Sequence, residues 1–600
     1  MKQFTALVMT LAFTASALAA PAPQDTSGSS AKKRSTRAST PSVSVQLDRM
    51  QQAIDAQQKQ IEQLRQQVQS RDQVVQQLQQ RLDQSQSAAA EAQSKAEAAA
   101  AQAAQQQQSV TQLSSDVSDI KQNSANTALS LQETQKAVND LQSPLAIRFK
   151  GVTLTPGGFL AAEAVWRQRG TGSDINTPFN SIPFSGANNS HLSEFFGSGR
   201  QSRVSLLTEG KLKSAKLTGY LEADFLSAGV TSNNNQSNSY TLRQRQVWGQ
   251  AALDSGWSFT GGQMWSLLTE TKKGLDNRSE ALPMTIDPQY TVGFTWARQF
   301  GFRVTKNFAN KYWLGFAVEN SQETLTAHNA SANFVLGQLG NSGGLYNAFN
   351  GNYSYNPSPD LIFKLAAEPG LGHYEVFGVY SRFRSRVFPC ATNPTGVDCG
   401  GTLGPSAALA YNDSRHGGGF GANARWSVYN KRVDFGVHGF GGEGVGRYGT
   451  AGLSDVTVRP LGTLAPIRNY QALGTLEWHG PKLDVYGNAG GEYNARTWFV
   501  NGTKPVGYGA PGFVNSGCGT ELVPGSGGFS PTAPANCTGD TRVVIEGTFG
   551  FWYRIYNGSK GRLQFGPQYS YLVKTAWSGT PGTPHAINNM VFTSFRYYLP

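Results

Sequence analysis

The sequence predicts an all-β transmembrane barrel of 16 antiparallel strands, preceded by a long N-terminal α-helical coiled coil. Segments of about ten residues alternate apolar and polar side chains as far as the C-terminus, which is typical of membrane β-strands. Long polar loops alternate with short turns between these segments, and a heptad repeat precedes them. Lipid offers the backbone no hydrogen-bond partner, so strands cross a membrane only as a closed barrel. The sequence has no run of 18 apolar residues, which excludes a helical membrane protein.

The first 43 residues have the composition of an export signal followed by a linker. Residues 1–19 predict a secretory signal peptide, with a short basic start, an apolar stretch and a small-residue cleavage site that ends at Ala19. Residues 20–43 predict a disordered basic linker. An alternative is that its basic centre, Lys32-Lys33-Arg34, contacts the cell wall or lipid headgroups.

Residues 44–143 predict a coiled coil on the periplasmic side of the membrane. A heptad runs in phase from Leu47 to Leu141, which predicts a left-handed supercoil about 140 Å long. Polar residues at several core positions, such as Gln57 and Gln106, leave the number of helices open. A low-complexity tether is the alternative, and Pro144 ends the helix in either case.

Residues 144–600 predict the barrel, with long loops at the extracellular rim and short turns at the periplasmic rim. The expected strands are 157–169, 200–209, 215–226, 241–252, 257–267, 295–307, 312–322, 359–368, 372–386, 417–428, 432–446, 466–479, 481–499, 541–555, 561–577 and 586–599. In the segment 216–225, Leu217 and Leu221 alternate with Glu222 and Asp224, which predicts one lipid face and one water face. Aromatic residues near strand ends predict the interfacial girdles: Trp478, Trp552 and Tyr597.

The composition argues against nucleic-acid binding and against catalysis. The chain has a formal net charge of +12, but its basic residues are spread along the strands and no nucleic-acid motif is present. The segment Gly439–Gly444 fits a dinucleotide-binding pattern, yet no helix is expected after it and the chain has 67 glycines. No nucleophile elbow or metal-ligand pair is evident, so we expect no enzyme activity, no cofactor and no metal site.

A resemblance to a known family is carried by residues 200–267. Arg203-Val-Ser-Leu, Thr218-Gly-Tyr-Leu-Glu-Ala-Asp-Phe225, Leu242-Arg-Gln-Arg245 and Gly262-Gln-Met-Trp-Ser266 follow one another in order. This stretch resembles the DcaP-like trimeric outer-membrane porins and, more distantly, the phosphate-selective porins O and P. The resemblance implies trimers of barrels, a third loop folded into each lumen, and passage of small anions such as dicarboxylates. The long coiled coil, the loop cysteines and the lack of a terminal Phe depart from the family pattern.

Charged residues on the faces assigned to the lumen are the candidate site residues. The pore-lining, anion-selective set is Arg203, Arg243, Arg245, Arg382, Arg384, Arg425, Arg554 and Arg596. Opposing carboxylates are expected at Glu209, Glu222 and Asp224, and a constriction loop is expected to carry Glu270, Lys272, Lys273, Asp276 and Arg278. Each arginine has the alternative of pairing with a neighbouring carboxylate. Arg382 to Arg386 have a second alternative, a place at the extracellular rim next to lipopolysaccharide phosphates.

The four cysteines are even in number and are exported, which favours disulfides over a metal site. Cys390 and Cys399 share one long loop, and Cys518 and Cys537 share another. Pairing within each loop, Cys390-Cys399 and Cys518-Cys537, is the simplest of the three connectivities.

The expected function is an outer-membrane porin for passive diffusion of small hydrophilic, anionic solutes. The alternative is an envelope tether in which the coiled coil links the outer membrane to the peptidoglycan. The expected partners are two further copies in a homotrimer, outer-membrane lipid and lipopolysaccharide, with peptidoglycan as the partner of the tether.

Overall fold

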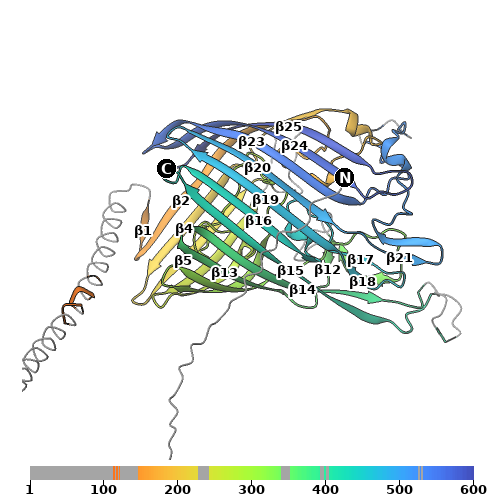
Figure 1. Cartoon of the computed structure of the whole chain (residues 1–600), viewed down its shortest axis with the longest axis horizontal. Coiled ribbons are helices and arrows are strands. Elements are labelled where there is room, and N and C mark those ends of the chain that lie inside the picture. Colours follow the sequence, from red (N-terminus) through yellow and green to blue (C-terminus); the bar gives the residue numbers. More distant parts are fainter. Residues whose placement is uncertain are drawn as a thin grey trace, which may run out of the picture. The chain divides into compact units, whose positions relative to one another are not determined.

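The computed structural model describes residues 112–114, 116–118, 121, 146–226, 242–339, 352–391, 398–400, 405–524, 528 and 531–600. The chain divides into two units, Met1–Glu133 and Thr134–Pro600. The second unit is a closed antiparallel β-barrel, which Figure 1 shows as oblique strands running between two rims. The barrel of 16 strands predicted from the sequence is therefore confirmed.

Sixteen strands form the ring, in chain order, and each pairs with the next. They are β2 (Val152–Arg167), β4 (Arg203–Lys211), β5 (Ala215–Asp224), β6 (Arg243–Leu253), β7 (Trp257–Trp265), β8 (Arg298–Phe308), β9 (Tyr312–Glu319), β13 (Asp360–Gly370), β14 (Gly372–Val387), β15 (Tyr411–Val428), β16 (Val433–Glu443), β19 (Arg468–His479), β20 (Leu483–Asn494), β23 (Thr541–Gly558), β24 (Gly561–Ala576) and β25 (His585–Tyr598). The ring closes because β2 pairs with β25 on one side and with β4 on the other.

Shorter elements extend the ring or lie within its long loops. Three short strands pair with strands of the ring. They are β1 (Ile147–Phe149) and β3 (Glu194–Ser198), which pair with β2, and β10 (Phe334–Val335), which pairs with β14. Three hairpins lie in loops: β11 (Gly337–Leu339) with β12 (Asn352–Ser354), β17 (Val456–Val458) with β18 (Leu464–Pro466), and β21 (Thr497–Asn501) with β22 (Lys504–Tyr508). Short 3-10 helices span Phe179–Ser181, Asn188–His191, Gly446–Tyr448 and Ser516–Gly519. In Figure 1 the loop hairpins β17, β18 and β21 gather at one rim.

Short turns and long loops alternate around the barrel as the sequence predicts. The tightest connection joins β13 to β14 through Leu371, and Gly372 adopts a positive φ of 81° there, which favours glycine. The long connections include loop 3 (266–297), loop 4 (320–359), loop 5 (388–410), loop 6 (444–467) and loop 7 (495–540). The disulfide Cys390–Cys399 lies in loop 5 and Cys518–Cys537 in loop 7, which is the pairing that the sequence favours.

The two faces of the barrel differ as a membrane protein requires. Large apolar side chains are exposed on the outer face, among them Phe300, Phe302, Phe363, Leu476 and Phe549. Inward positions carry buried polar and charged groups, so water and polar groups lie inside and apolar groups outside. One girdle assignment is wrong. Trp552 is 3% exposed and lies inside the barrel beside Arg596. Its even-numbered position in β23 places its side chain on the same inner face as Glu546 and Thr548.

Most of the N-terminal predictions lie outside the described residues. These are the signal peptide (1–19), the basic linker (20–43) and nearly all of the coiled coil (44–143). Of the coiled coil, the structure describes residues 112–114, 116–118 and 121, and all are helical. Within the part of the chain that the structure describes, no helix is long and apolar enough to cross a membrane.

Candidate functional site in the lumen

Loop 3 (266–297) leaves the wall after β7 and crosses the inside of the barrel before β8 begins. Its backbone and side chains bond to inward-facing residues on β14, β16, β20, β23 and β24. These strands belong to the wall across the lumen from β7, so the loop spans the lumen instead of extending above the rim. The sequence placed the constriction loop at 268–294, within the segment that enters the barrel.

The first half of loop 3 is anchored to a buried carboxylate on β14. The Thr271 hydroxyl donates to Glu375 Oε1 at 2.6 Å, and the Thr271 amide donates to the same oxygen at 3.0 Å. Glu375 also pairs with Lys364 of β13 at 2.7 Å, and Lys364 donates to the Thr269 carbonyl. Burial makes these bonds difficult to replace, so this end of the loop is held firmly against the wall.

The second half is anchored to two carboxylates on the neighbouring wall. The Val292 amide donates to Glu546 Oε2 at 3.0 Å, and the Gly293 amide donates to Glu492 Oε1 at 2.9 Å. Both carboxylates are buried. Buried amide hydrogen bonds are costly to leave unmade, so these two carboxyl groups fix the path of this part of the loop.

Two glycines allow loop 3 to touch the wall at this point. A Cβ on Gly490 of β20 would lie 1.9 Å from the Val292 carbonyl oxygen. Gly293 has a φ of 88°, and its Cβ would lie 2.1 Å from the Ala472 carbonyl oxygen. A side chain at Gly490 would therefore force the loop away from β20, and one at Gly293 would force it away from β19.

An arginine cluster lies on the inner face of β4, β5 and β6. Arg245 pairs with Glu222 at 2.6 Å and with Asp224 at 2.8 Å. Arg243 pairs with Asp224 at 2.8 Å, and Arg203 lies 3.6 Å from Glu222. The carboxylates Glu222 and Asp224 thus lie beside these arginines on adjacent strands. The expectation that acidic and basic walls face each other across the lumen is therefore wrong for these residues.

Sequence reasoning missed Arg298, the first residue of β8. Its guanidinium stacks on Trp265 and Trp296 at 4.8 and 4.9 Å, and the charges of Arg203, Arg243 and Arg245 act on it. No described carboxylate pairs with it, and its buried Nη1 has no hydrogen-bond partner among the described residues. Trp296 is two residues away in the sequence, but Trp265 and the three arginines come from other strands, so only the Trp296-Ala297-Arg298 segment at the end of loop 3 is a local signal.

The arginine cluster and Arg298 together hold an excess of positive charge. Three guanidinium groups share the two carboxylates Glu222 and Asp224, and the Arg298 guanidinium lies next to them without a carboxylate partner among the described residues. Buried nitrogens of Arg203 and Arg245 also lack a partner among the described residues. An excess of positive charge in the wall beside loop 3 favours an anion over a cation in the passage.

The other predicted inward residues are paired. Arg425 pairs with Glu270 of loop 3 at 2.8 Å, and Arg596 pairs with Glu163 at 2.8 Å. Arg554 pairs with Asp484, and Glu209 pairs with Lys216 at 2.5 Å near the short-turn rim. Arg425 and Arg596 are buried, so they hold loop 3 and the wall together more than they contact solute.

Loop 3 itself presents charges to the lumen. Lys272, Lys273, Asp276 and Arg278 are all exposed, and Arg278 lies over the Tyr220 ring at 4.8 Å. No described ion pair involves the three cations. Glu270 differs because it is buried against Arg425.

Arg382 and Arg384 were predicted to line the pore, and the structure contradicts this. On β14 the odd-numbered positions from His373 to Val387 are buried, while Val376 and Tyr380 are 53% and 42% exposed on the outer face. Arg382, Arg384 and Arg386 share the parity of Val376 and Tyr380. They therefore face outward, because side chains alternate along a strand.

A chamber of about 370 Å³ lies below loop 3, next to the arginine cluster. Its lining includes Arg203, Arg562 and Arg596 from the wall and Asp287 and Tyr290 from loop 3. The lining also includes the carboxyl groups of Glu222 and Asp484, so three cations and three carboxyl groups surround one space. A solute that passes loop 3 would meet them there.

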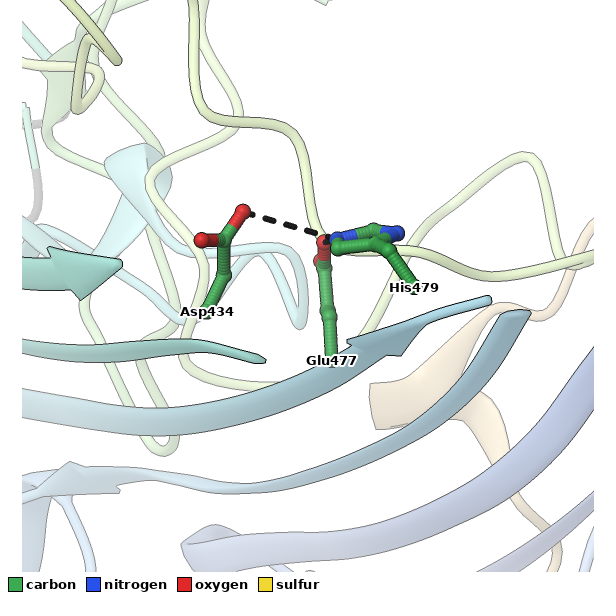
Figure 2. A group of neighbouring side chains, drawn as sticks. All are labelled: Asp434, Glu477 and His479. Carbon is green, nitrogen blue, oxygen red and sulfur yellow. Dashed lines mark ion pairs between the residues drawn. The ribbon is translucent and has the colours of Figure 1, made fainter. Parts of the chain in front are cut away.

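A carboxylate-histidine cluster lies on the inner face near the short-turn rim (Figure 2). His479 Nε2 lies 3.4 Å from Glu477 and 3.5 Å from Asp434, while its Nδ1 lies 3.1 Å from Asp484. Among the described residues, Asp434, Glu477 and His479 form the group whose spacing could hold a metal ion. The three side chains also satisfy one another as ion pairs, and the expectation of no metal site stays a prediction.

Loops 4 and 6 pack over the lumen through a buried acidic group. The amide of Arg384 donates to Glu323 of loop 4, while Arg447 of loop 6 pairs with Asp455 and Asp360. Burial is the main cause that raises the pKa of Glu323 to about 8, and Asp455 adds to it. Glu323 is therefore protonated in the folded loop under conditions where it ionises in an unfolded chain.

We expect this contact to weaken as the pH rises. The folded loop binds the proton more tightly than the unfolded one, so stability is greatest below the unfolded pKa near 4.5 and is lost as the pH approaches 8. Hydrogen-exchange protection factors of residues 321–325 should fall between pH 5 and pH 8. The Glu323→Gln variant should show no such fall, and an equal fall in that variant would contradict the assignment.

The fold and the lumen define a class: a sixteen-stranded membrane barrel with a loop folded inside. No family model and no curated protein matches the chain. Among solved structures, the chain is similar to the outer membrane channel DcaP of Acinetobacter baumannii, with 13% identity, coverage of 76% of this chain and 99% of that one, and a TM-score of 0.50. This confirms, at the level of fold, the resemblance carried by residues 200–267.

Two further structures match with lower scores. The anion-selective porin from Comamonas acidovorans is 9% identical, with coverage of 75% of this chain and 100% of that one, and a TM-score of 0.39. OmpF of Salmonella typhi is 11% identical, with coverage of 76% and 100%, and a TM-score of 0.38.

Proposed function

We propose that this protein is an outer-membrane porin that passes small anionic solutes through the barrel lumen. The observation that carries the proposal is the arginine cluster beside loop 3 together with the adjacent Arg298, which has no carboxylate partner among the described residues. The chamber below the loop adds Arg562 to these cations, beside the paired Arg596 and the carboxyl groups of Glu222, Asp287 and Asp484. The apolar outer face supports a place in a lipid bilayer.

Dicarboxylates are the solute class that suits this lumen. Two carboxylates on one small molecule can bridge cations on opposite sides of a passage, and the exposed Lys272, Lys273 and Arg278 of loop 3 lie in the same lumen as Arg298. The assembly proposed is a trimer, in line with the resemblance of residues 200–267. The periplasmic coiled coil and its contact with the cell wall fall outside the described residues and stay predictions.

Planar-bilayer recording of the purified protein across a KCl gradient tests the proposal. We expect openings in steps of three and a reversal potential with the sign of chloride preference. Added succinate should reduce the chloride current, while glycerol at the same concentration should not. Cation preference would overturn the anion assignment, and a folded, inserted protein that never conducts would overturn the porin assignment.

A further inference from the structure

The outer face of β14 carries a row of three arginines directly beyond the apolar belt. Arg382, Arg384 and Arg386 occupy alternate positions, so their Cα atoms span about 13 Å along one face of the strand. Below them on the same face lie Tyr380 and Val376, both exposed. The strand therefore changes from apolar to cationic within two residues.

The arginines are not neutralised by carboxylates. Arg384 donates to the Tyr355 carbonyl and Arg386 to the Asn412 side chain, both at 3.2 Å. Among the described residues, none of the three arginines forms an ion pair, and the sequences 340–351, 392–397 and 401–404 contain no Asp or Glu. The outward carboxylate Glu443, two strands away, is already paired with Arg468 at 3.0 Å. The row is thus a positive patch that no described carboxylate pairs with, and the nearby Glu323 of loop 4, on which the charge of Arg384 acts, has its pKa raised by burial to about 8.

The height of the row places it at the outer edge of the membrane. Arg382 lies opposite His416 on β15, and Trp426, which stacks on Phe435 on the outer face, lies ten residues along β15 towards the short-turn rim. Ten residues of strand at a tilt of about 40° rise about 25 Å, the height of the apolar band in such barrels. If Trp426 marks the inner interface, Arg382 marks the outer one.

An apolar groove of about 450 Å³ lies on the same outer wall, immediately below the arginines. It is lined by Phe316, Leu361, Phe363, Val376, Tyr380 and Phe420. Its floor lies at Gly378, which has no side chain and pairs with Phe420 across the strand. A groove of this composition fits an acyl chain, whose burial there removes apolar surface from the lipid–water boundary.

We propose that this wall binds lipid A, the phosphorylated glycolipid anchor of lipopolysaccharide, with its phosphates on Arg382, Arg384 and Arg386 and one acyl chain in the groove. Arginine forks bind phosphate in two-point contacts, and the row is long enough to engage two phosphates on one headgroup. The outer-leaflet position favours this lipid over phospholipids. The inference rests on the outer-membrane location proposed above, but it does not depend on what the lumen conducts.

Native mass spectrometry of the detergent-purified protein with added lipid A tests the proposal. The triple variant Arg382→Gln, Arg384→Gln, Arg386→Gln should bind lipid A at least about tenfold more weakly, since each lost charged hydrogen bond matters by roughly a factor of ten. The matched control removes three charges from the opposite rim: Lys431→Gln, Arg432→Gln, Lys482→Gln. It should bind like the unaltered protein. Heat-modifiable migration on gels reports that each variant is folded.

A second variant tests the groove independently of charge. Gly378→Leu places a side chain in the groove against Phe420, which is 83% exposed and free to move aside. We expect this variant to bind lipid A more weakly and to bind inorganic phosphate as the unaltered protein does. Equal binding of lipid A by the triple variant, or equal binding of phosphatidylglycerol and lipid A by the unaltered protein, would overturn the proposal. Loss of trimers in the triple variant would assign the face to contacts between barrels and would also overturn it.

Conductance separates this proposal from the function of the lumen. The triple variant should keep the single-channel conductance and the reversal potential of the unaltered protein, because its arginines face away from the pore. A channel that fails to conduct in all variants, while lipid A still binds, would reject the porin and leave the lipid site in place.

Discussion

The Gly490→Val variant should conduct at least about twofold more current per channel than the unaltered protein, because pore diameter controls passage. A Cβ at this position would lie 1.9 Å from the Val292 carbonyl oxygen, so loop 3 must move off β20. The movement also breaks the bonds of Val292 to Glu546 and of Gly293 to Glu492. Larger solutes should then pass, which a liposome-swelling assay with sugars of increasing size measures.

The adjacent residue provides the control. A Cβ on Gly491 would make only ordinary contacts at 3.5 and 3.6 Å, and its side chain would point outward, so Gly491→Val should leave conductance unchanged. Should Gly490→Val fail to fold, the pair Glu492→Gln and Glu546→Gln weakens the same anchors without changing shape. If Glu492→Gln and Glu546→Gln both fold and leave the conductance unaltered, loop 3 does not form the constriction.

The strands were predictable because every one repeats the same two-residue alternation. Leu217 and Leu221 face outward and Glu222 and Asp224 inward, as their parity predicts. The same rule applied to β14 gives the correct answer for Arg382, since Val376 fixes the outward parity. The wrong assignment came from treating a row of arginines as a pore lining without testing its phase against the apolar residues of its own strand.

The candidate site was harder to predict because loop 3 brings it together. The contact of Thr271 with Glu375 joins residues more than a hundred positions apart, and no local pattern encodes it. The pairing of Glu222 with Arg245 was within reach, because hairpin register places β5 beside β6. Arg298 could not be recognised, since its role depends on two tryptophans and three arginines from separate elements.

Arg298→Gln should shift the channel from anion towards cation preference, with the chloride-to-potassium permeability ratio falling about fivefold. One unit charge a few ångströms from a permeating ion changes the free energy of that ion by about 1 kcal/mol in water. Because 1.4 kcal/mol changes an equilibrium constant about tenfold, this energy corresponds to about a fivefold change in the permeability ratio. Arg298 is a cleaner probe than Arg243 or Arg245. Arg243 and Arg245 pair with the buried carboxylates Asp224 and Glu222, so their removal would disturb a buried ion-pair network in the barrel wall as well as change the charge of the lumen.

Lys306→Gln is the matched control for Arg298→Gln, because it removes the same charge from the same strand. Lys306 lies over Trp257 and Phe308, which are exposed, and donates to the Ser255 carbonyl near the short-turn rim. Its loss should leave the reversal potential unchanged. An equal shift in both variants would indicate that the overall charge of the barrel sets selectivity. An unchanged ratio in Arg298→Gln would move the selective site from the arginine cluster to the exposed cations of loop 3, where Lys272→Gln and Lys273→Gln then become the decisive pair.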